Sequence, residues 1–340
     1  MSLNSSHPES VAAPQALPAS LPDYIAIARP DNWVKNVFML PGMLFAFVVY
    51  HTPIDMTLLA RVLVAIGSTC LVASANYVIN EYLDAEFDRF HPLKNKRTSV
   101  VRVVNPVLVY SEYALLAGVG LSLAWTISMQ FLVISAFLLV MGVIYNVKPM
   151  RSKDRVYLDV LSESVNNPIR FALGWFALTP VAALPATAWD IDWLTFPPTS
   201  IIVAYWMGGA FLMATKRFAE YRLIGDPERA GLYRRSFRFY TENSLLISMF
   251  FYALTCAFFL GIFLIKNRIE LLISFPFFAL LFAWYLKIGL LKDSPVQGSE
   301  KLYTRKYFMT YVVLFALLLV VLMFIDIPWL NWFLIHSVNN

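Results

Sequence analysis

Long apolar segments dominate this chain and restrict what it can fold into. A helix of about 20 apolar residues crosses the hydrocarbon core of a bilayer. Nine segments approach or exceed that length, at 35–51, 58–79, 107–126, 128–147, 158–180, 198–215, 244–265, 270–290 and 308–326. Only 14% of the residues are charged, whereas a soluble domain carries about 25%. The sequence therefore predicts an all-α, polytopic membrane protein with nine transmembrane helices.

The first 22 residues differ from the rest of the chain. Residues 1–22 are rich in Ser, Pro and Ala, and they lack the basic start and apolar run of a signal peptide. Their composition predicts a disordered tail, and residues 23–340 are predicted to form a single transmembrane domain. Pro41 and Gly42 lie inside the first apolar segment and predict a kink there.

Basic residues gather in alternate loops. The loops 80–106, 148–157, 216–243 and 287–306 hold 21 of the 27 Lys and Arg residues, and two more precede or begin the first segment. Loops rich in Lys and Arg stay on the cytoplasmic side. We therefore expect the protein to lie in the inner membrane of the cell, with its N-terminus and these four loops in the cytoplasm. The net charge of +5 follows from this topology, and no nucleic acid partner is expected.

An acidic motif follows the second apolar segment. Asn80, Asp84 and Asp88 are spaced four residues apart and would share one face of a helix, with Glu81 beside them. Stacked carboxylates repel unless a cation lies between them. Mg²⁺ usually takes one or two carboxylates and completes its shell with phosphate and water, so the motif favours a site for Mg²⁺ and a phosphorylated ligand. The alternative is a solvated acidic helix end.

Basic residues continue from this motif. They could hold a phosphate group or anchor the loop at anionic lipid. These residues are His91, Lys94, Lys96 and Arg97, together with Pro92 in the same stretch.

A second polar face lies inside the fifth apolar segment. Asp159, Glu163, either Asn166 or Asn167, and Arg170 recur there at helical spacing. Ionisable groups within a membrane are costly and normally face a polar cavity. The face therefore indicates a functional site, although an internal ion pair of Glu163 with Arg170 that only fixes packing remains the alternative.

Two further motifs carry basic residues. Lys216 and Glu220 form an i, i+4 pair in the stretch KRFAEYR, which by itself is more typical of a basic helix end. In the stretch RPDNWVKN, Trp33 and Lys35 would ordinarily anchor the interface. Arg29 and Lys35 could instead point at a phosphate.

The two acidic stretches on nine helices resemble the UbiA superfamily of intramembrane prenyltransferases. Its first signature, NDxxDxxxD, reads Asn80-Glu81-x-x-Asp84-x-x-x-Asp88 here, and its second, DxxxD, reads Asp159-x-x-x-Glu163. Both departures from the signatures keep a carboxylate but lengthen the side chain. The resemblance implies that the nine helices enclose an intramembrane cavity.

Other motifs resemble one branch, the decaprenyl-phosphate phosphoribosyltransferases. The opening RPxxWxKN of that branch matches residues 29–36, and a DREHP-like stretch matches residues 88–92. A Tyr and a Lys before the second signature are similar to Tyr145 and Lys148, and KRxAE matches residues 216–220. The segment YLDVLSESVNNPIR departs from the branch. The resemblance covers about residues 24–325.

The resemblance implies transfer of 5-phosphoribose from phosphoribosyl pyrophosphate to a polyprenyl phosphate, with release of pyrophosphate and with Mg²⁺ as cofactor. It implies catalytic roles for Asp84, Asp88, Asp159 and Arg170. The implied metal-binding residues are Asn80, Glu81, Asp84, Asp88, Asp159 and Glu163. The implied substrate-binding residues are Lys35, Asn80, Arg89, His91, Lys94, Tyr145, Lys148, Lys153, Asn167, Lys216, Arg217, Glu220 and Arg222.

Two other functions compete with this one. An ordinary prenyltransferase would use the same metal site for a prenyl diphosphate donor and an aromatic or other ring acceptor, but it needs fewer basic residues than the seven in loop 216–243. A transporter could also use intramembrane acids, yet the chain lacks the repeated halves of many transporters. The sequence leaves a homo-oligomer open.

A ribose donor carries phosphate at both ends and needs two anion sites. We expect Lys216, Arg217 and Arg222, with Lys35, to bind its 5-phosphate while the acids and Mg²⁺ hold its pyrophosphate. Arg suits phosphate through its fork of donors and Lys through its point charge. A prenyl diphosphate needs only one such site, because its other end is hydrocarbon.

The alternating basic loops generate a test of topology. In intact cells, a cysteine introduced at Asn95 or Asp226 should resist a membrane-impermeant thiol reagent and react after the cells are permeabilised, because both positions are expected in the cytoplasm. Labelling from outside at either position would overturn the orientation.

Overall fold

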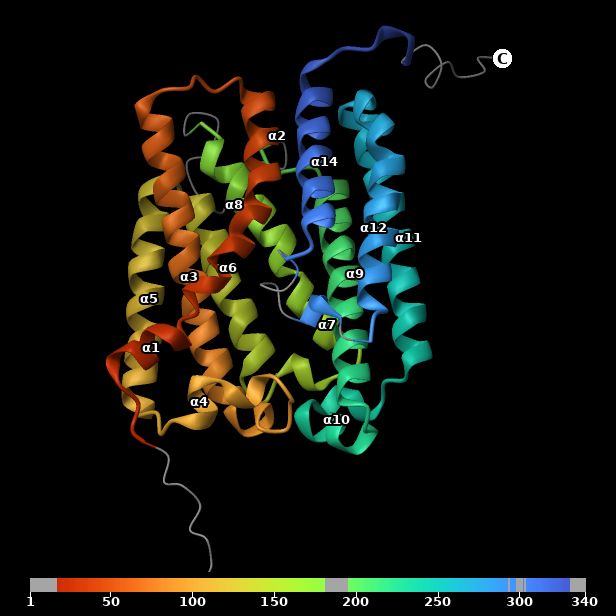
Figure 1. Ribbon diagram of the computed structural model, residues 1–340. Coiled ribbons are helices and arrows are strands. Elements are labelled where there is room, and N and C mark those ends of the chain that lie inside the picture. Colours follow the sequence, from red (N-terminus) through yellow and green to blue (C-terminus); the bar gives the residue numbers. More distant parts are fainter. Residues whose placement is uncertain (1–16, 181–194, 293, 298–301, 303, 331–340) are drawn as a thin grey trace, which may run out of the picture.

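The computed structural model describes residues 17–180, 195–292, 294–297, 302 and 304–330, and it is a bundle of long helices (Figure 1). The elements of its first half are α1 Leu21–Ile27, η1 Pro30–Met39, α2 Leu40–Tyr50, α3 Met56–Asp88, η2 Lys94–Lys96, α4 Thr98–Val101, α5 Pro106–Ile127, α6 Met129–Asn146 and η3 Ser152–Asp154. Those of its second half are α7 Leu158–Ser164, α8 Asn166–Leu178, α9 Thr199–Ile224, α10 Pro227–Tyr233, η5 Arg235–Arg238, α11 Glu242–Asn267, η6 Ile269–Ser274, α12 Phe275–Gly289, η7 Pro295–Gln297 and α14 Lys306–Phe324.

The prediction of an all-helical, multi-pass membrane protein is confirmed. Among the described residues, seven helical stretches are long and apolar enough to cross a membrane: Leu21–Tyr50, Met56–Asp88, Pro106–Ile127, Met129–Asn146, Glu242–Asn267, Ile269–Gly289 and Lys306–Phe324. The remaining two predicted spans, 158–180 and 198–215, are also largely helical but do not meet both criteria. The count of nine spans therefore stays a prediction.

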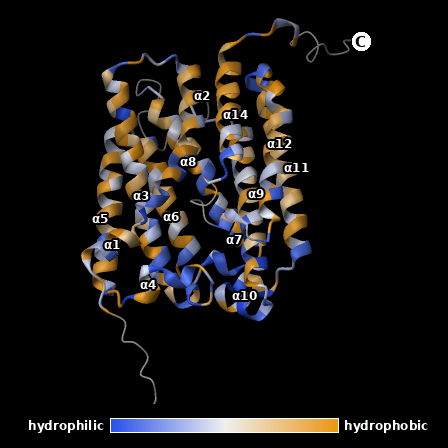
Figure 2. Ribbon diagram, in the orientation of Figure 1, coloured by the Kyte–Doolittle hydropathy of each residue, from blue (hydrophilic) through white to orange (hydrophobic). Residues whose placement is uncertain are grey.

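The polar loops gather at one end of the bundle. Hydrophilic residues concentrate around α4 and α10, whereas the helices above them are mainly apolar (Figure 2). This distribution agrees with the alternation of basic loops along the sequence. Of the expected tail 1–22, residues 1–16 lie outside the described residues, and α1 already begins at Leu21.

Two apolar cores hold the bundle together. One forms around α9 and α11, with Phe211 and Leu245 buried in it. The other joins α2, α3, α5, α6 and α8, with Phe131 and Leu173 at its centre. The polar cavity described below is lined by residues of both halves of the bundle.

Prolines lie beside two interruptions of the helices, and the one at Pro41 is predicted from the sequence. The first span changes from the 3₁₀-helix η1 to the α-helix α2 at Leu40, directly before Pro41. The fifth span is divided at Val165 into α7 and α8. Pro168 has no N–H to donate to the carbonyl of Ser164, four residues earlier, so the ladder of hydrogen bonds is interrupted there.

Helix α3 is longer than the apolar segment that predicts it. It begins after Asp55, whose carboxylate accepts from the N–H of Leu58 at 2.7 Å, and it ends at Asp88 rather than near residue 79. The residues between Asn80 and Asp88 are mostly ordinary helix formers, with neither Gly nor Pro among them. The acidic motif therefore lies on a continuous helix that projects beyond the apolar core.

Helices α2 and α8 approach through glycine. A Cβ atom added to Gly42 would lie 2.0 Å from the carbonyl oxygen of Phe171, and one added to Gly174 would lie 2.0 Å from that of Met39. Small residues allow membrane helices to pack this closely. This contact fixes η1 and its Lys35 against α8.

The glycine contact predicts the effect of one added methyl group. Gly42→Ala should destabilise the protein by roughly 1–3 kcal/mol, because the helices must separate. A lowered thermal unfolding midpoint in detergent would report this loss. Gly118→Ala is the matched control, since nothing lies within 4 Å of its added Cβ; equal midpoints for the two variants would contradict the packing argument.

Candidate functional site

A cavity of about 120 Å³ opens between α3, α6, α7, α9 and the loop segments at the polar end of the bundle. Its lining contains three acidic side chains, Asp84, Asp88 and Glu163. It contains seven basic side chains, Arg29, Lys35, Lys94, Arg97, Lys216, Arg217 and Arg234. This excess of positive charge suits a polyanionic ligand.

The acidic motif faces this cavity as predicted. Asn80, Asp84 and Asp88 all line it, which confirms that they share one face of α3. The amide of Asn80 donates to Asn146 Oδ1 at 2.6 Å. Asp88 Oδ2 lies 2.5 Å from Arg97 Nη1.

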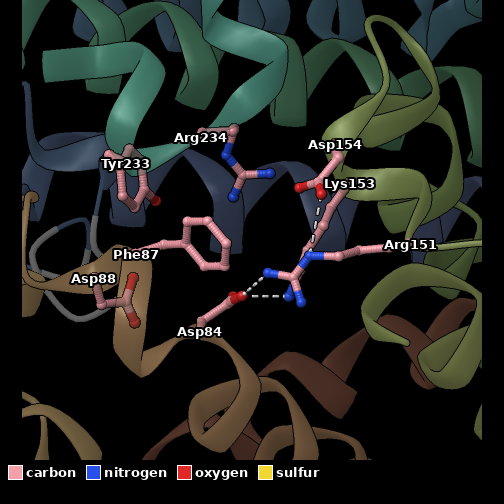
Figure 3. Close-up of a pocket in the computed structure, with 8 residues that line it drawn as sticks. All are labelled: Asp84, Phe87, Asp88, Arg151, Lys153, Asp154, Tyr233 and Arg234. Atoms are coloured by element: carbon pink, nitrogen blue, oxygen red, sulfur yellow. Dashed lines mark hydrogen bonds and ion pairs between the residues drawn. The ribbon is translucent and has the colours of Figure 1, made fainter. Parts of the chain in front are cut away.

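Asp84 is held from the loop that follows α6. Its Oδ1 lies 2.9 Å from Arg151 Nη2 and 2.5 Å from Lys153 Nζ (Figure 3). Lys153 also donates to Asn146 Oδ1 at 2.7 Å. Burial lowers the pKa of Lys153 to about 8, although the neighbouring Asp84 carboxylate raises it. These contacts place two cations at the edge of the cavity, next to the acidic face.

The donor set fits a Mg²⁺ ion that is shared with phosphate. Two carboxylates and the Asn80 amide line a single cavity, and Mg²⁺ typically takes one or two carboxylates with phosphate and water. Among the described residues there is no group of three or more His, Cys, Asp or Glu side chains that would form an all-protein cage. The arrangement suits an ion that arrives with a phosphorylated ligand.

Arg217 is the centre of a buried charge network. Its side chain is 1% exposed, and it pairs with Asp159 at 3.3 Å, with Glu220 at 2.9 Å and with Glu163. The hydroxyl of Tyr145 donates to Glu163 Oε2 at 2.7 Å. A buried charge of this kind is stable only with such partners, so Arg217 joins α7 to α9.

The network continues into the loop after α3. Glu220, which is fully buried, lies 2.6 Å from Lys94 Nζ, and Lys94 also donates to the hydroxyl of Tyr233. Burial lowers the pKa of Lys94, but the Glu220 carboxylate outweighs it and the pKa ends above its ordinary value. Lys94 therefore stays charged at the mouth of the cavity.

His91 supports this loop. Its Nδ1 accepts hydrogen bonds from the backbone N–H groups of Leu93 and Lys94, at 3.1 and 3.2 Å, and its ring packs edge-on against Tyr233. Burial, together with the charge of Lys94, lowers the pKa of His91 to about 3. A neutral, buried imidazole that shapes the loop is a different role from the expected contact with substrate.

Two lysines in the cavity have no carboxylate partner. Lys35 and Lys216 both line the cavity, and within the described residues neither makes an ion pair at 4.0 Å or less. The ammonium of Lys35 lies 5.6 Å from the ring centroid of Tyr77. The two lysines interact electrostatically with each other and with Glu163. They are cations available to a ligand.

Several predicted residues are not brought to this cavity. Asp159 is fully buried against Arg217, Tyr240 and Ser236, and Glu81 is turned toward Arg29, with 4.0 Å between the charged atoms. Neither carboxylate lines the cavity, and each is instead paired with a basic residue of the lining, Asp159 with Arg217 and Glu81 with Arg29. We therefore leave both out of the metal site, while Glu163 lines the cavity but is held by Arg217.

Two other predicted residues, Asn167 and Arg170, lie on α8, and their positions on that helix decide which groups they contact. Asn166, not Asn167, lines the cavity, because adjacent helix residues point about 100° apart. Asn167 instead lies against Gly209. Arg170 is buried and donates to Asn36 Oδ1 at 2.9 Å and to the Asn166 carbonyl at 3.3 Å, so the alternative ion pair with Glu163 is not formed.

Three expected phosphate ligands point elsewhere. Arg89 donates to the carbonyl of Glu86 at 2.7 Å, and Lys148 is exposed. Arg222 donates to the carbonyl of Leu290 at 3.1 Å and lies 3.7 Å from Glu242. None of the three lines the cavity.

Other residues at the site escaped sequence reasoning. Arg151 and Arg234 belong to basic loops, where the sequence gives no more than a topology signal. For Arg97 the sequence predicts a contact with phosphate or an anchor for its loop, but not its pairing with Asp88. Asn146 and Tyr233 resemble ordinary helix-end residues. A basic residue beside an acidic motif, such as Arg97, is the one signal that could have identified a partner for Asp88.

Comparison with known proteins gives a consistent result. The model of the UbiA prenyltransferase family matches residues 37–302. The decaprenyl-phosphate phosphoribosyltransferase of Mycolicibacterium smegmatis is 29% identical over 248 residues, which cover 72% of this chain and 71% of that protein. The protein of the same name from Mycobacterium tuberculosis is 30% identical over 218 residues, which cover 64% of this chain and 65% of that protein.

A solved structure shares the fold. The structure of a UbiA homologue from Archaeoglobus fulgidus bound to DMAPP and Mg²⁺ matches with a TM-score of 0.59 at 17% identity. The match covers 89% of this chain and 98% of that one.

The charge network predicts different outcomes for two adjacent residues. Arg217→Gln should destabilise the protein by roughly 3–5 kcal/mol, because it leaves buried carboxylates without a partner. Lys216→Gln should change stability by less than about 1 kcal/mol, since Lys216 has no ion pair to lose. Thermal unfolding in detergent compares the two. If the Arg217 variant were more stable than the Lys216 variant, the structural role assigned to Arg217 would be wrong.

Proposed function

Because the chain belongs to the UbiA prenyltransferase family, we propose that it is an intramembrane transferase that moves 5-phosphoribose from phosphoribosyl pyrophosphate to a polyprenyl phosphate. The observation that carries this proposal is the cavity itself, which combines Asp84 and Asp88 with the unpaired cations Lys35 and Lys216. A donor with phosphate at both ends needs two anion sites. The relatives named decaprenyl-phosphate phosphoribosyltransferase support the same pair of substrates.

The proposed reaction is a single displacement at the anomeric carbon of the ribose. An oxygen of the lipid phosphate forms the new bond to this carbon, and the bond from the carbon to pyrophosphate breaks, so pyrophosphate leaves with the electron pair. The attacking phosphate is already anionic, so no general base is needed. This agrees with His91 lying buried in the loop rather than in the cavity lining.

Each group in the cavity has a part in this proposal. Asp84, Asp88 and Asn80 would hold Mg²⁺, which when bound neutralises the charge of the leaving pyrophosphate. Lys35 and Lys216 bind the 5-phosphate as point charges. Preorganised charges and positioning supply most of the rate in such a site.

Orientation in the membrane follows from the same end of the bundle. We place the basic loops and the mouth of the cavity in the cytoplasm, in the inner membrane of the cell, because Lys and Arg concentrate there. The water-soluble donor then enters from the cytoplasm and the lipid acceptor from the bilayer. A homo-oligomer stays a prediction from the sequence.

The proposal is tested with purified protein, phosphoribosyl pyrophosphate, Mg²⁺ and a polyprenyl phosphate, followed by mass spectrometry of the lipid. The product should carry one added phosphoribosyl group, and Asp84→Asn should abolish it while the protein stays folded. Glu86→Gln, which changes an exposed acid on the same helix, is the control and should retain activity. If the protein instead moves a prenyl group from a prenyl diphosphate onto an aromatic acceptor, the phosphoribosyl proposal fails.

The unpaired cations predict a selective defect in donor binding. Lys216→Gln should raise the KM for phosphoribosyl pyrophosphate by about tenfold, the loss expected for one charge-assisted contact, and leave the KM for polyprenyl phosphate unchanged. Arg222→Gln is the matched control, because Arg222 does not line the cavity. Steady-state kinetics that give the two variants the same donor KM would remove Lys216 from the donor site.

A further inference from the structure

A second cavity lies between α12 and α14, apart from the candidate active site. Its volume is about 460 Å³, and it shares no lining residue with the cavity that contains Asp84. Three of its lining residues are basic, Lys287, Arg305 and Lys306. Trp284 and Tyr307 supply aromatic walls. We call this cavity the α12–α14 pocket.

The three cations of this pocket have no ion-pair partner among the residues that the structure describes. Within the described part of the chain, Lys287, Arg305 and Lys306 make no ion pair, and no acidic residue lines the pocket. By contrast, Arg268, which lies between α11 and η6, pairs with Glu270 at 3.2 Å and with Asp326 at 2.8 Å. A structural arginine in this protein therefore has partners, whereas the three pocket cations are open to an anion.

The pocket lies where two membrane-spanning helices end. Lys287 is in the last turn of α12, and Lys306 is the first residue of α14. Both helices end above the polar cap that contains α4 and α10 (Figure 1). Aromatic and basic side chains at the ends of spanning helices meet the level of lipid headgroups. The pocket is thus open at the height where phosphate groups of the bilayer lie.

The residues around the cations suit a lipid tail as well. Trp284 contacts Phe308, with 5.7 Å between the ring centroids, and forms an apolar floor with it, while Tyr307 is 86% exposed. Apolar rings below a cluster of cations match a molecule with an anionic head and a hydrocarbon body.

We propose that the α12–α14 pocket binds the headgroup of an anionic phospholipid of the surrounding bilayer. Lys287, Arg305 and Lys306 contact the lipid phosphate, and Trp284 and Tyr307 contact the upper part of the acyl chains. The described residues that line the pocket include no carboxylate that would recruit Mg²⁺, so its lining differs in chemistry from that of the Asp84 cavity. The bound lipid is a bilayer component rather than the lipid acceptor of the reaction.

The test is a titration of the purified protein in neutral detergent with phosphatidylglycerol, read by native mass spectrometry. Phosphatidylcholine, which has no net charge, is the reference lipid. The pocket variant is Lys287→Gln, Arg305→Gln, Lys306→Gln. The matched control removes three exposed basic residues outside the pocket, as Arg155→Gln, Arg238→Gln, Lys292→Gln.

The pocket variant should bind the first phosphatidylglycerol about tenfold more weakly than the wild type, and phosphatidylcholine equally well. The control variant should bind both lipids like the wild type. A charge-preserving variant, Lys287→Arg, Arg305→Lys, Lys306→Arg, should retain binding and so separate loss of charge from loss of fold.

Two results would overturn the proposal. An equal loss in the pocket and control variants would show that net charge alone attracts the lipid, and no loss in the pocket variant would show that its three cations do not bind the lipid. Displacement of phosphatidylglycerol from the wild type by equimolar polyprenyl phosphate, or by millimolar inorganic phosphate, would assign the pocket to the acceptor or to free phosphate instead.

Discussion

The buried guanidinium of Arg217 is the contact on which the candidate site depends. It joins Asp159 and Glu163 of α7 to Glu220 of α9. Glu220 in turn holds Lys94 from the loop after α3. A charge this deeply buried is tolerated only when its partners surround it. One residue thereby fixes three chain segments around a single cavity, and the charges that remain unpaired are those the protein offers to a ligand.

The structure separates charges that hold the fold from charges that face a ligand. The sequence suggests Asp159 as a metal ligand, yet its carboxylate forms an ion pair with Arg217 and accepts a hydrogen bond from Tyr240. Lys216, the neighbour of Arg217 in the chain, lines the cavity without an ion pair. An unpaired cation in a partly desolvated cavity is unfavourable until an anion binds. The presence of the unpaired Lys216 in the cavity is therefore a physical argument for an anionic, phosphorylated substrate.

The Asp84 cavity and the α12–α14 pocket both offer unpaired cations to a ligand, but their linings differ. The cavity at Asp84 mixes acids with cations and so suits a metal together with phosphate. The described lining of the α12–α14 pocket has cations and aromatic rings without acids and so suits an anionic lipid. A transferase with one soluble and one lipid substrate must bind the phosphate groups of its substrates at the membrane surface and exclude the headgroup phosphates of the bilayer. Separate pockets of different chemistry allow this.

The sequence by itself determined the helices, the interruption of the first span and the acidic face. Apolar length predicts the spans, and Pro41 with Gly42 predicts the interruption of the first one. The four-residue spacing places Asn80, Asp84 and Asp88 on one face of α3. Only the tertiary structure decided which faces meet. In the folded protein Asn166, and not Asn167, lines the cavity, and Arg222 points away from it toward Leu290. Arg151 reaches Asp84 from a loop that is distant in the sequence. Periodicity fixes neighbours along one helix, but basic loops have no periodicity, and the packing of one helix against another is decided by contacts between residues far apart in the chain.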